Sequence, residues 1–169
     1  MARALIVGCG CRGRTLGGKL SEAGWAVRGT SRSAQGLAAI REAGLEAALA
    51  DPDRPGTLLE LIGDVAVVYY LLGSAVGPAE KLEAIHGPRL ERLMERFVDT
   101  PVRGVVYEAA GSVEPALLEG GAEIVRAAGE RWRIPHEIVG GESGLKPNEA
   151  ERWSAEMFDA ALRVLSPSV

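Results

Sequence analysis

Residues 4–13 of the chain read ALIVGCGCRG, an apolar run followed at once by a glycine-rich turn. The four residues Ala4-Leu5-Ile6-Val7 are typical of a strand that is buried on both faces of a parallel sheet. A helix is predicted after the turn, over residues 12–23, because Gly24 stands where a helix usually ends. A second strand over residues 25–30 completes the unit of about 30 residues in which the pattern G-x-G-x-x-G indicates a dinucleotide site.

Each glycine of this turn has its own predicted role. Gly8 permits the tight turn, Gly10 lets a pyrophosphate approach the backbone, and Gly13 lets the helix pack close to the strand. The helix N-terminus adds unpaired N–H groups and a partial positive charge, which both favour phosphate. The residues expected to contact the cofactor here are Gly8, Cys9, Gly10, Cys11, Arg12 and Gly13. The alternative is a purely structural turn that binds nothing.

The end of the second predicted strand indicates which dinucleotide is preferred. An NAD site usually has an acid there, which accepts hydrogen bonds from the ribose hydroxyls. This chain has Thr30-Ser31-Arg32 instead, and no acid before Glu42. A guanidinium can bind a 2′-phosphate through two hydrogen bonds, and neighbouring hydroxyls can donate others. We therefore expect NADP in preference to NAD, with Arg12 as a second positive charge. The alternative is that Arg32 is an ordinary solvated side chain.

The rest of the chain alternates short apolar runs with helical stretches. The predicted strands cover residues 4–7, 25–30, 45–49, 65–72, 102–107 and 134–139. Two helices are predicted over residues 12–23 and 115–128, and a third begins after Ser33, which caps it, and ends at residue 43. Further helical segments are a turn or two that ends at residue 62, a stretch from residue 79 that breaks at Gly87-Pro88, and a last helix that begins near Asn148. This alternation predicts an α/β fold, a doubly wound, Rossmann-like parallel sheet of about six strands in the order 3-2-1-4-5-6. Residues 65–72 are expected to be a central strand, although periodicity alone also allows a buried helix there.

Length and composition indicate an ordinary globular protein. The 169 residues suffice for one domain with a real core, so we expect a single NAD(P)-binding domain over residues 1–169. Hydrophobic residues make up 47% and charged residues 25%, which excludes a disordered or fibrous chain. No apolar run approaches the roughly 18 residues of a membrane span, and the apolar N-terminal stretch is too short for a signal peptide. We therefore expect a soluble, cytoplasmic protein.

Charge and cysteine content narrow the class of ligand. The net charge of −4 disfavours a general nucleic-acid binder. Residues 1–50 nevertheless hold seven basic residues against three acidic ones, which suggests a local anion site, with chance asymmetry as the alternative. Cys9 and Cys11 are too close in sequence for an unstrained disulfide, and two thiols without a nearby histidine fall short of a metal site. We interpret both as small side chains in a tight turn, with redox sensitivity as the alternative.

The chain resembles the short-chain dehydrogenase/reductase family, in its extended or atypical branch, over about residues 3–140. The resemblance rests on residues 8–16, Gly29-Thr30-Ser31-Arg32, Ala50-Asp51 and residues 71–75. It implies that Asp51 lies near the adenine ring and that Leu72, Gly73 and Ser74 run along the cofactor. The spacing G-x-G-x-x-G, in place of the extended branch's G-x-x-G-x-x-G, points to an atypical subgroup.

The family's catalytic pair, Tyr-x-x-x-Lys, has no counterpart here. In that pair the lysine lowers the pKa of the tyrosine, which can then shuttle a proton. Four residues after Tyr69, Tyr70 and Tyr107 stand Gly73, Ser74 and Gly111. The serine expected just after the fifth strand is also missing. Tyr107 and Glu108, at the carboxyl end of that strand, are one candidate donor–acceptor pair, with simple packing as the alternative. The catalytic residues therefore stay unassigned, and His86 and His136 are interpreted as structural or surface residues.

Two functions follow from this pattern. One is a small NADP-dependent reductase or epimerase with an unusual proton donor, which the family's usual activity favours. The other is a catalytically silent NADP-binding sensor or regulatory module, which the missing catalytic pair favours. A methyltransferase that uses S-adenosylmethionine also has a glycine turn, but the absence of an acid after the second strand argues against it. The expected partners are the cofactor and, for an enzyme, a small substrate. We expect no nucleic acid, membrane or metal, and the sequence leaves a homo-oligomer open.

Overall fold

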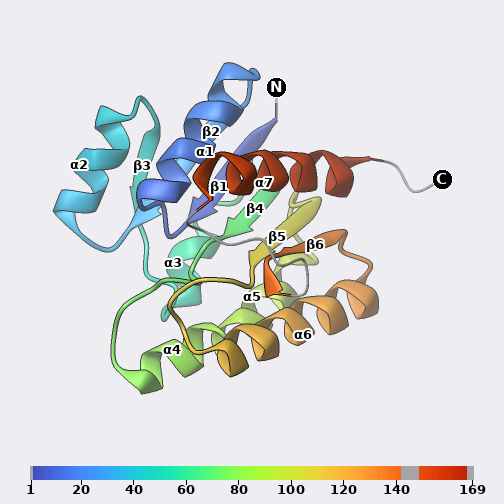
Figure 1. Ribbon diagram of the computed structural model, residues 1–169. Coiled ribbons are helices and arrows are strands. Elements are labelled where there is room, and N and C mark those ends of the chain that lie inside the picture. The colour runs from blue at the N-terminus through green and yellow to red at the C-terminus, as the bar shows by residue number, and fades with distance from the viewer. Residues whose placement is uncertain (1, 142–148, 167–169) are drawn as a thin grey trace.

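The chain folds around one six-stranded parallel sheet with the predicted order, β3-β2-β1-β4-β5-β6 (Figure 1). The computed structural model describes residues 2–141 and 149–166. The strands are β1 (Arg3–Val7), β2 (Ala26–Ser31), β3 (Glu46–Leu49), β4 (Val67–Tyr70), β5 (Gly104–Glu108) and β6 (His136–Val139). The helices are α1 (Cys11–Glu22), α2 (Ala34–Glu42), α3 (Pro55–Leu59), α4 (Ala79–Ile85), α5 (Pro88–Phe97), α6 (Pro115–Trp132) and α7 (Ala150–Leu165). The predicted doubly wound α/β fold is confirmed.

Helices cover both faces of the sheet because its central strands are apolar on both sides. Ala4 and Ile6 face one core, which α1, α2 and α7 complete. Leu5 and Val7 face the other core, which is completed from α3 to α6. Figure 1 shows these helices as two layers with the strands between them. All four residues of β4 are buried, as expected for a strand that lies between β1 and β5.

The helix cap and the helix break that the sequence predicts are confirmed. The Ser33 hydroxyl caps α2 by accepting a hydrogen bond of 3.0 Å from the Gly36 N–H. The helical stretch from Ala79 breaks where predicted, and Pro88 opens α5 at a position that needs no N–H donor. The predicted start of the last helix near Asn148 lies outside the described residues.

Some boundaries differ from those predicted. β4 covers 67–70 rather than 65–72, because its register with β1 joins only these four residues to positions 4–7. α3 ends at Leu59, before the predicted 62. α6 continues past the predicted end at 128 to Trp132, and it closes at Arg133, whose φ of 55° is left-handed. These differences move the ends of elements without changing their order.

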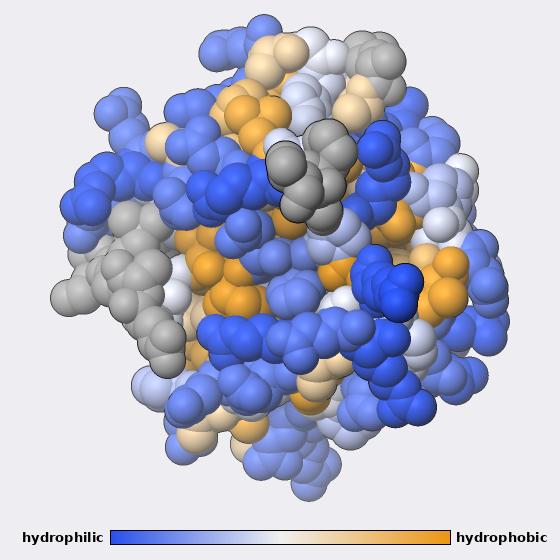
Figure 2. Space-filling model, turned by 90° about the vertical axis from the view of Figure 1, so that its right-hand side faces the viewer, coloured by the Kyte–Doolittle hydropathy of each residue, from blue (hydrophilic) through white to orange (hydrophobic). Residues whose placement is uncertain are grey.

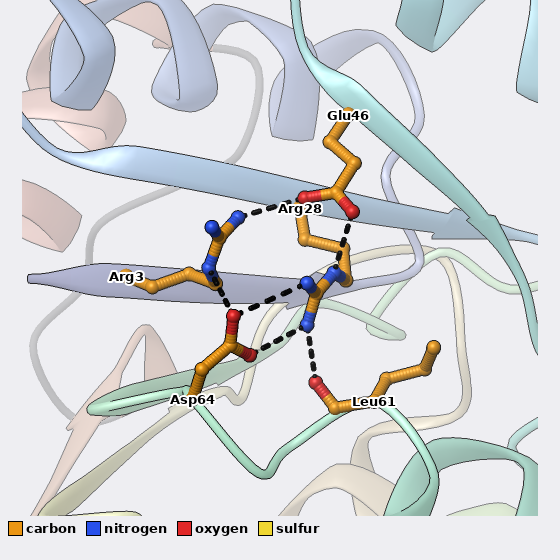
Figure 3. Close-up of polar contacts among 5 residues, drawn as sticks. All are labelled: Arg3, Arg28, Glu46, Leu61 and Asp64. Carbon is orange, nitrogen blue, oxygen red and sulfur yellow. Dashed lines mark hydrogen bonds and ion pairs between the residues drawn. The ribbon is translucent and has the colours of Figure 1, made fainter.

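A network of four charged side chains lies near the N-terminal ends of the strands, and we call it the N-terminal charge network (Figure 3). Arg3 of β1 contacts Glu46 of β3 at 2.7 Å and Asp64, just before β4, at 2.8 Å. Arg28 of β2 contacts the same two carboxylates at 3.2 and 2.9 Å, and also donates to the Leu61 carbonyl at 2.6 Å. The network thus links neighbouring strands at the end of the sheet opposite the glycine turn.

The molecular surface mixes polar and apolar residues. On the face that lies at the right of Figure 1, hydrophobic residues appear in separate areas between hydrophilic ones (Figure 2). No helix among the described residues combines the length and the apolar character that crossing a bilayer requires.

Candidate functional site

The glycine turn is fixed to the ends of the neighbouring strands. Gly8 has a φ of 80°, and a Cβ at this position would lie 2.6 Å from the Leu71 carbonyl oxygen. The Gly8 N–H donates to the Thr30 hydroxyl at 3.2 Å, and the Cys9 N–H donates to the Thr30 carbonyl at 3.0 Å. A Cβ on Gly13 would lie 3.2 Å from Ile6, which matches its predicted role in close packing of helix and strand. Two glycines of the motif therefore serve the fold itself.

Gly10 is different, because nothing in the described fold requires a glycine there. Its backbone is extended, with a φ of −84° that does not demand glycine, and it is the N-cap of α1 without a side chain to make the cap hydrogen bond. Apart from its chain neighbours, no described atom lies within 4 Å of the place where its Cβ would be. The first turn of α1 therefore presents its N–H groups across an open backbone face, as an anion site requires.

This open face borders a cavity of about 590 Å³ at the carboxyl ends of β1, β2 and β4. The predicted site residues that line it are Gly8, Cys9, Gly10, Cys11, Arg12, Gly13, Thr30, Ser31, Arg32, Asp51, Leu72 and Ser74. Other members of the wall, which the sequence did not indicate, include Arg14, Gly36, Asp53, Val76 and Lys81. The structure therefore brings the predicted residues together around one cavity, with Gly73 as the exception.

Gly73 lies behind the cavity wall, where β4 meets the end of β5. Its N–H donates to Glu108 Oε1 at 3.0 Å, and its carbonyl accepts from the Val113 N–H at 2.9 Å. A Cβ at this position would collide with the Ala110 carbonyl. Gly73 therefore joins two strand ends and does not line the cavity.

The turn between β2 and α2 forms the part of the wall where a 2′-phosphate is expected. Arg32 is exposed there, beside the N-terminus of α2. Ser31 Oγ accepts from the Ser33 N–H at 3.2 Å, and a Cβ on Gly36 would collide with it. Thr30, predicted as a phosphate ligand, is only 1% exposed, and its hydroxyl already accepts from the glycine turn. Thr30, Ser31 and Arg32 all line the cavity, but Thr30 positions the glycine turn, whereas Arg32 is exposed.

Two acids from the loop after β3 lie on the cavity wall. Asp51 Oδ1 accepts from the Asp53 N–H at 2.9 Å, and Asp53 contacts Arg89 at 3.3 Å. The Asp51 N–H donates to the Thr57 hydroxyl at 2.9 Å. These contacts hold the loop after β3 in place, with Asp51 at the position that the family resemblance gives to the adenine end of the cofactor.

Tyr107 and Glu108 do not form a joint donor–acceptor pair, because consecutive residues of a strand point to opposite faces of the sheet. Tyr107 belongs to the core on the side of α5 and α6, and its hydroxyl lies 2.7 Å from His86 Nδ1. His86 is itself only 2% exposed, and its Nε2 lies 2.9 Å from the Leu72 carbonyl. Burial lowers the pKa of His86, which keeps the ring neutral. His86 is therefore a structural residue and not a surface one.

The other tyrosines are equally withdrawn from the cavity. The Tyr69 hydroxyl donates to the Met157 carbonyl at 3.1 Å, and the Tyr70 hydroxyl donates to the Ile85 carbonyl at 2.6 Å. Burial raises the pKa of Tyr69, Tyr70 and Tyr107 above the ordinary tyrosine value. All three tyrosines of the chain are therefore buried, protonated and engaged in hydrogen bonds.

Glu108 points to the same side of the sheet as α1 and α7, and it is fully buried. Its Oε1 lies 3.2 Å from Arg12 Nη2. Burial raises the pKa of Glu108 to about 7, against the opposing effects of Arg12, the Gly73 N–H and the nearby Trp153 indole. Sequence reasoning placed Glu108 at the site, but it did not indicate the partnership with Arg12.

The two cysteines have different surroundings. Cys9 is buried, with its Sγ only 2.7 Å from where a Cβ on Gly29 would lie, and burial raises its pKa to about 11. Cys11 is exposed and lines the cavity. Cys9 thus fills a space that a larger side chain would not fit.

Comparison with known proteins identifies the fold. No protein-family model matches the sequence, and a search of curated proteins finds no match. Among solved structures, a protein from Aeromonas hydrophila assigned to the short-chain dehydrogenase/reductase family as an oxidoreductase is similar over 100% of this chain and 93% of its own. Its TM-score is 0.71 and its sequence identity 17%.

Two larger enzymes are also similar. UDP-glucose 4-epimerase from Thermotoga maritima matches 80% of this chain with a TM-score of 0.67 and 12% identity. The triphenylmethane reductase of a Citrobacter species, solved with NADP(H), matches 82% with a TM-score of 0.58 and 16% identity. The chain spans about half the length of both, 54% and 48%. The chain therefore has the Rossmann fold of the short-chain dehydrogenases/reductases.

Proposed function

We propose that this protein binds NADP(H) in the cavity beside the glycine turn. The observation that carries the proposal is Gly10, which lines the cavity with an open backbone face that the fold itself does not require. A pyrophosphate needs such a face, because its oxygens must reach the N–H groups of the first turn of α1. The cavity volume of about 590 Å³ suits an organic ligand of cofactor size.

The preference for NADP over NAD is supported by the turn after β2. Arg32 is exposed on the cavity wall, next to the N-terminus of α2 and the Ser31 hydroxyl. A guanidinium and a helix N-terminus together favour a phosphate dianion. No acid follows β2 in the sequence before Glu42. Asp51 lies close to this turn, because the Ala50 N–H donates to the Ser31 carbonyl at 3.2 Å, but Asp51 and Asp53 are each held by contacts of their own.

We further propose reductase or epimerase chemistry with a proton donor other than tyrosine. Both kinds of enzyme occur among the proteins with this fold. The second candidate function is a catalytically silent NADP-binding sensor or regulatory module. The specific observation in its favour is that all three tyrosine hydroxyls are buried and bonded away from the cavity. A tyrosine in that state cannot deliver a proton to a substrate in the cavity.

Titration of the purified protein with NADP, NAD and S-adenosylmethionine tests the proposal. We expect NADP to bind most tightly, NAD more weakly and S-adenosylmethionine not at all. If S-adenosylmethionine bound tightly and neither dinucleotide bound, the proposal that the protein binds NADP(H) would be wrong.

A second measurement separates the two candidate functions. NADPH oxidation is followed in the presence of a panel of carbonyl compounds, with enzyme-free and NADPH-free controls. Turnover of any member supports a reductase. Binding of NADPH without oxidation across the panel argues against a reductase. An epimerase regenerates its cofactor, so the silent module is favoured only when a panel of epimerisable substrates is not converted either.

A further inference from the structure

Behind the glycine turn lies a buried carboxylate for which the proposed function has no use. Glu108, the last residue of β5, is fully buried. Its Oε1 accepts from the Gly73 N–H at 3.0 Å and contacts Arg12 Nη2 at 3.2 Å. Its Oε2 makes no hydrogen bond of normal geometry among the described residues, although the Trp153 indole N–H, which also lacks a partner, lies near enough to lower the pKa of Glu108. A buried carboxylate with one unsatisfied oxygen stays ionised only while a nearby cation neutralises it.

That cation, Arg12, belongs to the cavity as well. Its side chain is 24% exposed and lines the cavity on the first turn of α1. Its guanidinium also lies 5.5 Å from the centre of the Trp153 ring. A phosphate bound at the first turn of α1 would therefore compete with Glu108 for the same guanidinium.

We infer that Glu108 is a proton-binding positioning residue of the dinucleotide site. When it is ionised, it holds Arg12 at the back of the cavity. When a dinucleotide binds, Arg12 turns to the pyrophosphate and Glu108 takes a proton from solvent, which it releases when the dinucleotide leaves. This inference rests on the proposed function, because it requires a polyanion at the glycine turn.

The charges around Glu108 fix the direction of the effect. Among the described residues, α1 contributes Arg12, α7 contributes the uncharged Trp153, and the segment after β4 contributes the Gly73 N–H. Tyr107 points to the other face and is neutral. Asp51 and Asp53 also line the cavity, but they come from the loop after β3, whereas Glu108 shares Arg12 with the first turn of α1. A phosphate bound at that turn therefore raises the pKa of Glu108 further from about 7.

Dinucleotide affinity should consequently rise as the pH falls. A rise of one pKa unit on binding corresponds to an affinity about tenfold higher at pH 6 than at pH 9. Near neutral pH, the same shift gives an uptake of roughly half a proton for each molecule bound.

The test is calorimetric titration of the full chain between pH 6 and 8.5, in buffers of different ionisation enthalpy, with NAD as the probe. NAD is preferred because the 2′-phosphate of NADP itself titrates near pH 6. Glu108→Gln keeps an oxygen for the Gly73 N–H and removes the charge, so proton uptake should vanish. Arg12→Met removes the shared cation, so uptake should vanish there too, with weaker binding. His86→Gln, which changes another buried titratable group, serves as the control and should keep the uptake.

The outcomes distinguish the inference from the proposed function. NAD binding with proton uptake in wild type and His86→Gln, and without it in Glu108→Gln, supports the inference. Binding without uptake, or equal uptake in Glu108→Gln, overturns the inference and leaves the proposed function standing. Failure of both NAD and NADP to bind at any pH overturns both.

Discussion

Arginine–carboxylate contacts occur at both ends of the sheet, in opposite surroundings. In the N-terminal charge network, Glu46 and Asp64 are 49% and 54% exposed, and each contacts two arginines. At the carboxyl end, Glu108 is fully buried and contacts a single arginine, Arg12. A hydrogen bond from Arg28 holds the pKa of Asp64 below its usual value, whereas burial raises that of Glu108. Burial, more than the presence of an arginine, therefore decides in which direction each pKa moves.

This difference in burial indicates that the two ends of the sheet have different roles. The N-terminal charge network satisfies its carboxylates with several donors, and such exposed pairs contribute only modestly to stability. The carboxyl end keeps a cavity, an open glycine and a carboxylate oxygen without a partner. Ligands of doubly wound sheets bind at the carboxyl ends of the strands. The incompletely satisfied end is therefore the one suited to a ligand.

The largest effect on stability is expected at the carboxyl end, from Gly8→Ala. This residue has a φ of 80°, and its new Cβ would lie 2.6 Å from the Leu71 carbonyl oxygen, which is backbone. We expect the free energy of unfolding to fall by about 3 kcal/mol or more. Denaturant unfolding measures this loss, and Gly18→Ala on the open side of α1 is the control, with a gain of roughly 0.5–1 kcal/mol. Equal stability of Gly8→Ala and wild type would contradict the packing of the turn.

The pH dependence of stability should differ between the two ends. The folded-state pKa of Glu108 lies above its ordinary value of 4.5, at about 7, so its burial costs nothing below pH 4.5 and progressively more as the pH rises to 7. The loss is on the order of 3 kcal/mol. Asp64 has a lowered pKa, so its contribution is present above pH 3.8 and is lost as the pH falls below that value.

The measurement is denaturant unfolding of wild type, Glu108→Gln and Asp64→Asn at a series of pH values. Glu108→Gln should flatten the decline between pH 4.5 and 7, whereas Asp64→Asn should leave it intact. A decline of the same size in Glu108→Gln would show that another group causes it.

Arg32→Ala tests the cofactor preference at the carboxyl end. A charge-assisted hydrogen bond to the 2′-phosphate contributes about 1.5–3 kcal/mol, so NADP affinity should fall roughly tenfold to a hundredfold. NAD lacks that phosphate, and its affinity should hardly change. Both affinities are measured at one fixed salt concentration. Equal losses for both cofactors, or none, would remove Arg32 from the site.

The smallest effects are expected in the N-terminal charge network. Arg28→Met removes contacts to two carboxylates and the Leu61 carbonyl and should cost about 1 kcal/mol, whereas the more exposed Arg3→Met should cost about 0.5 kcal/mol. Both losses should shrink at high salt, and NADP affinity should stay unchanged. A clear loss of NADP affinity in either variant would show that the two ends of the sheet are energetically coupled, whereas we treat them as independent.

Local features of the chain were predictable from sequence. The apolar run before Gly8, the cap at Ser33 and the break at Gly87-Pro88 depend on neighbouring residues, and all three occur as expected. The strand order follows from the alternation of elements and the handedness of crossovers. The predicted ends of the strands were less accurate, because the partner strands determine where pairing stops.

The contact between Arg12 and Glu108 was not predictable in this way, since 96 positions separate the two residues. It requires the Arg12 side chain, on the first turn of α1, to reach the carboxyl end of β5, and Trp153 joins it because α7 packs against both α1 and β5. One signal was available in the sequence: Glu108 directly continues the apolar run 104–107. A carboxylate that extends a buried strand needs a partner, and the sequence does not reveal which arginine supplies it.

The binding of NADP at Gly10 is tested most directly by comparing the NADP affinities of wild type and Gly10→Val. The valine side chain enters open space in the free protein, so the variant should fold, with a loss of about 1 kcal/mol because valine is a poor N-cap. It would occupy the face that a pyrophosphate needs, so we expect NADP affinity to fall by about a hundredfold or more. Gly18→Val, on the same helix but away from the cavity wall, should bind NADP like wild type. Undiminished NADP affinity in a folded Gly10→Val variant would contradict the assignment of the glycine turn as the cofactor site.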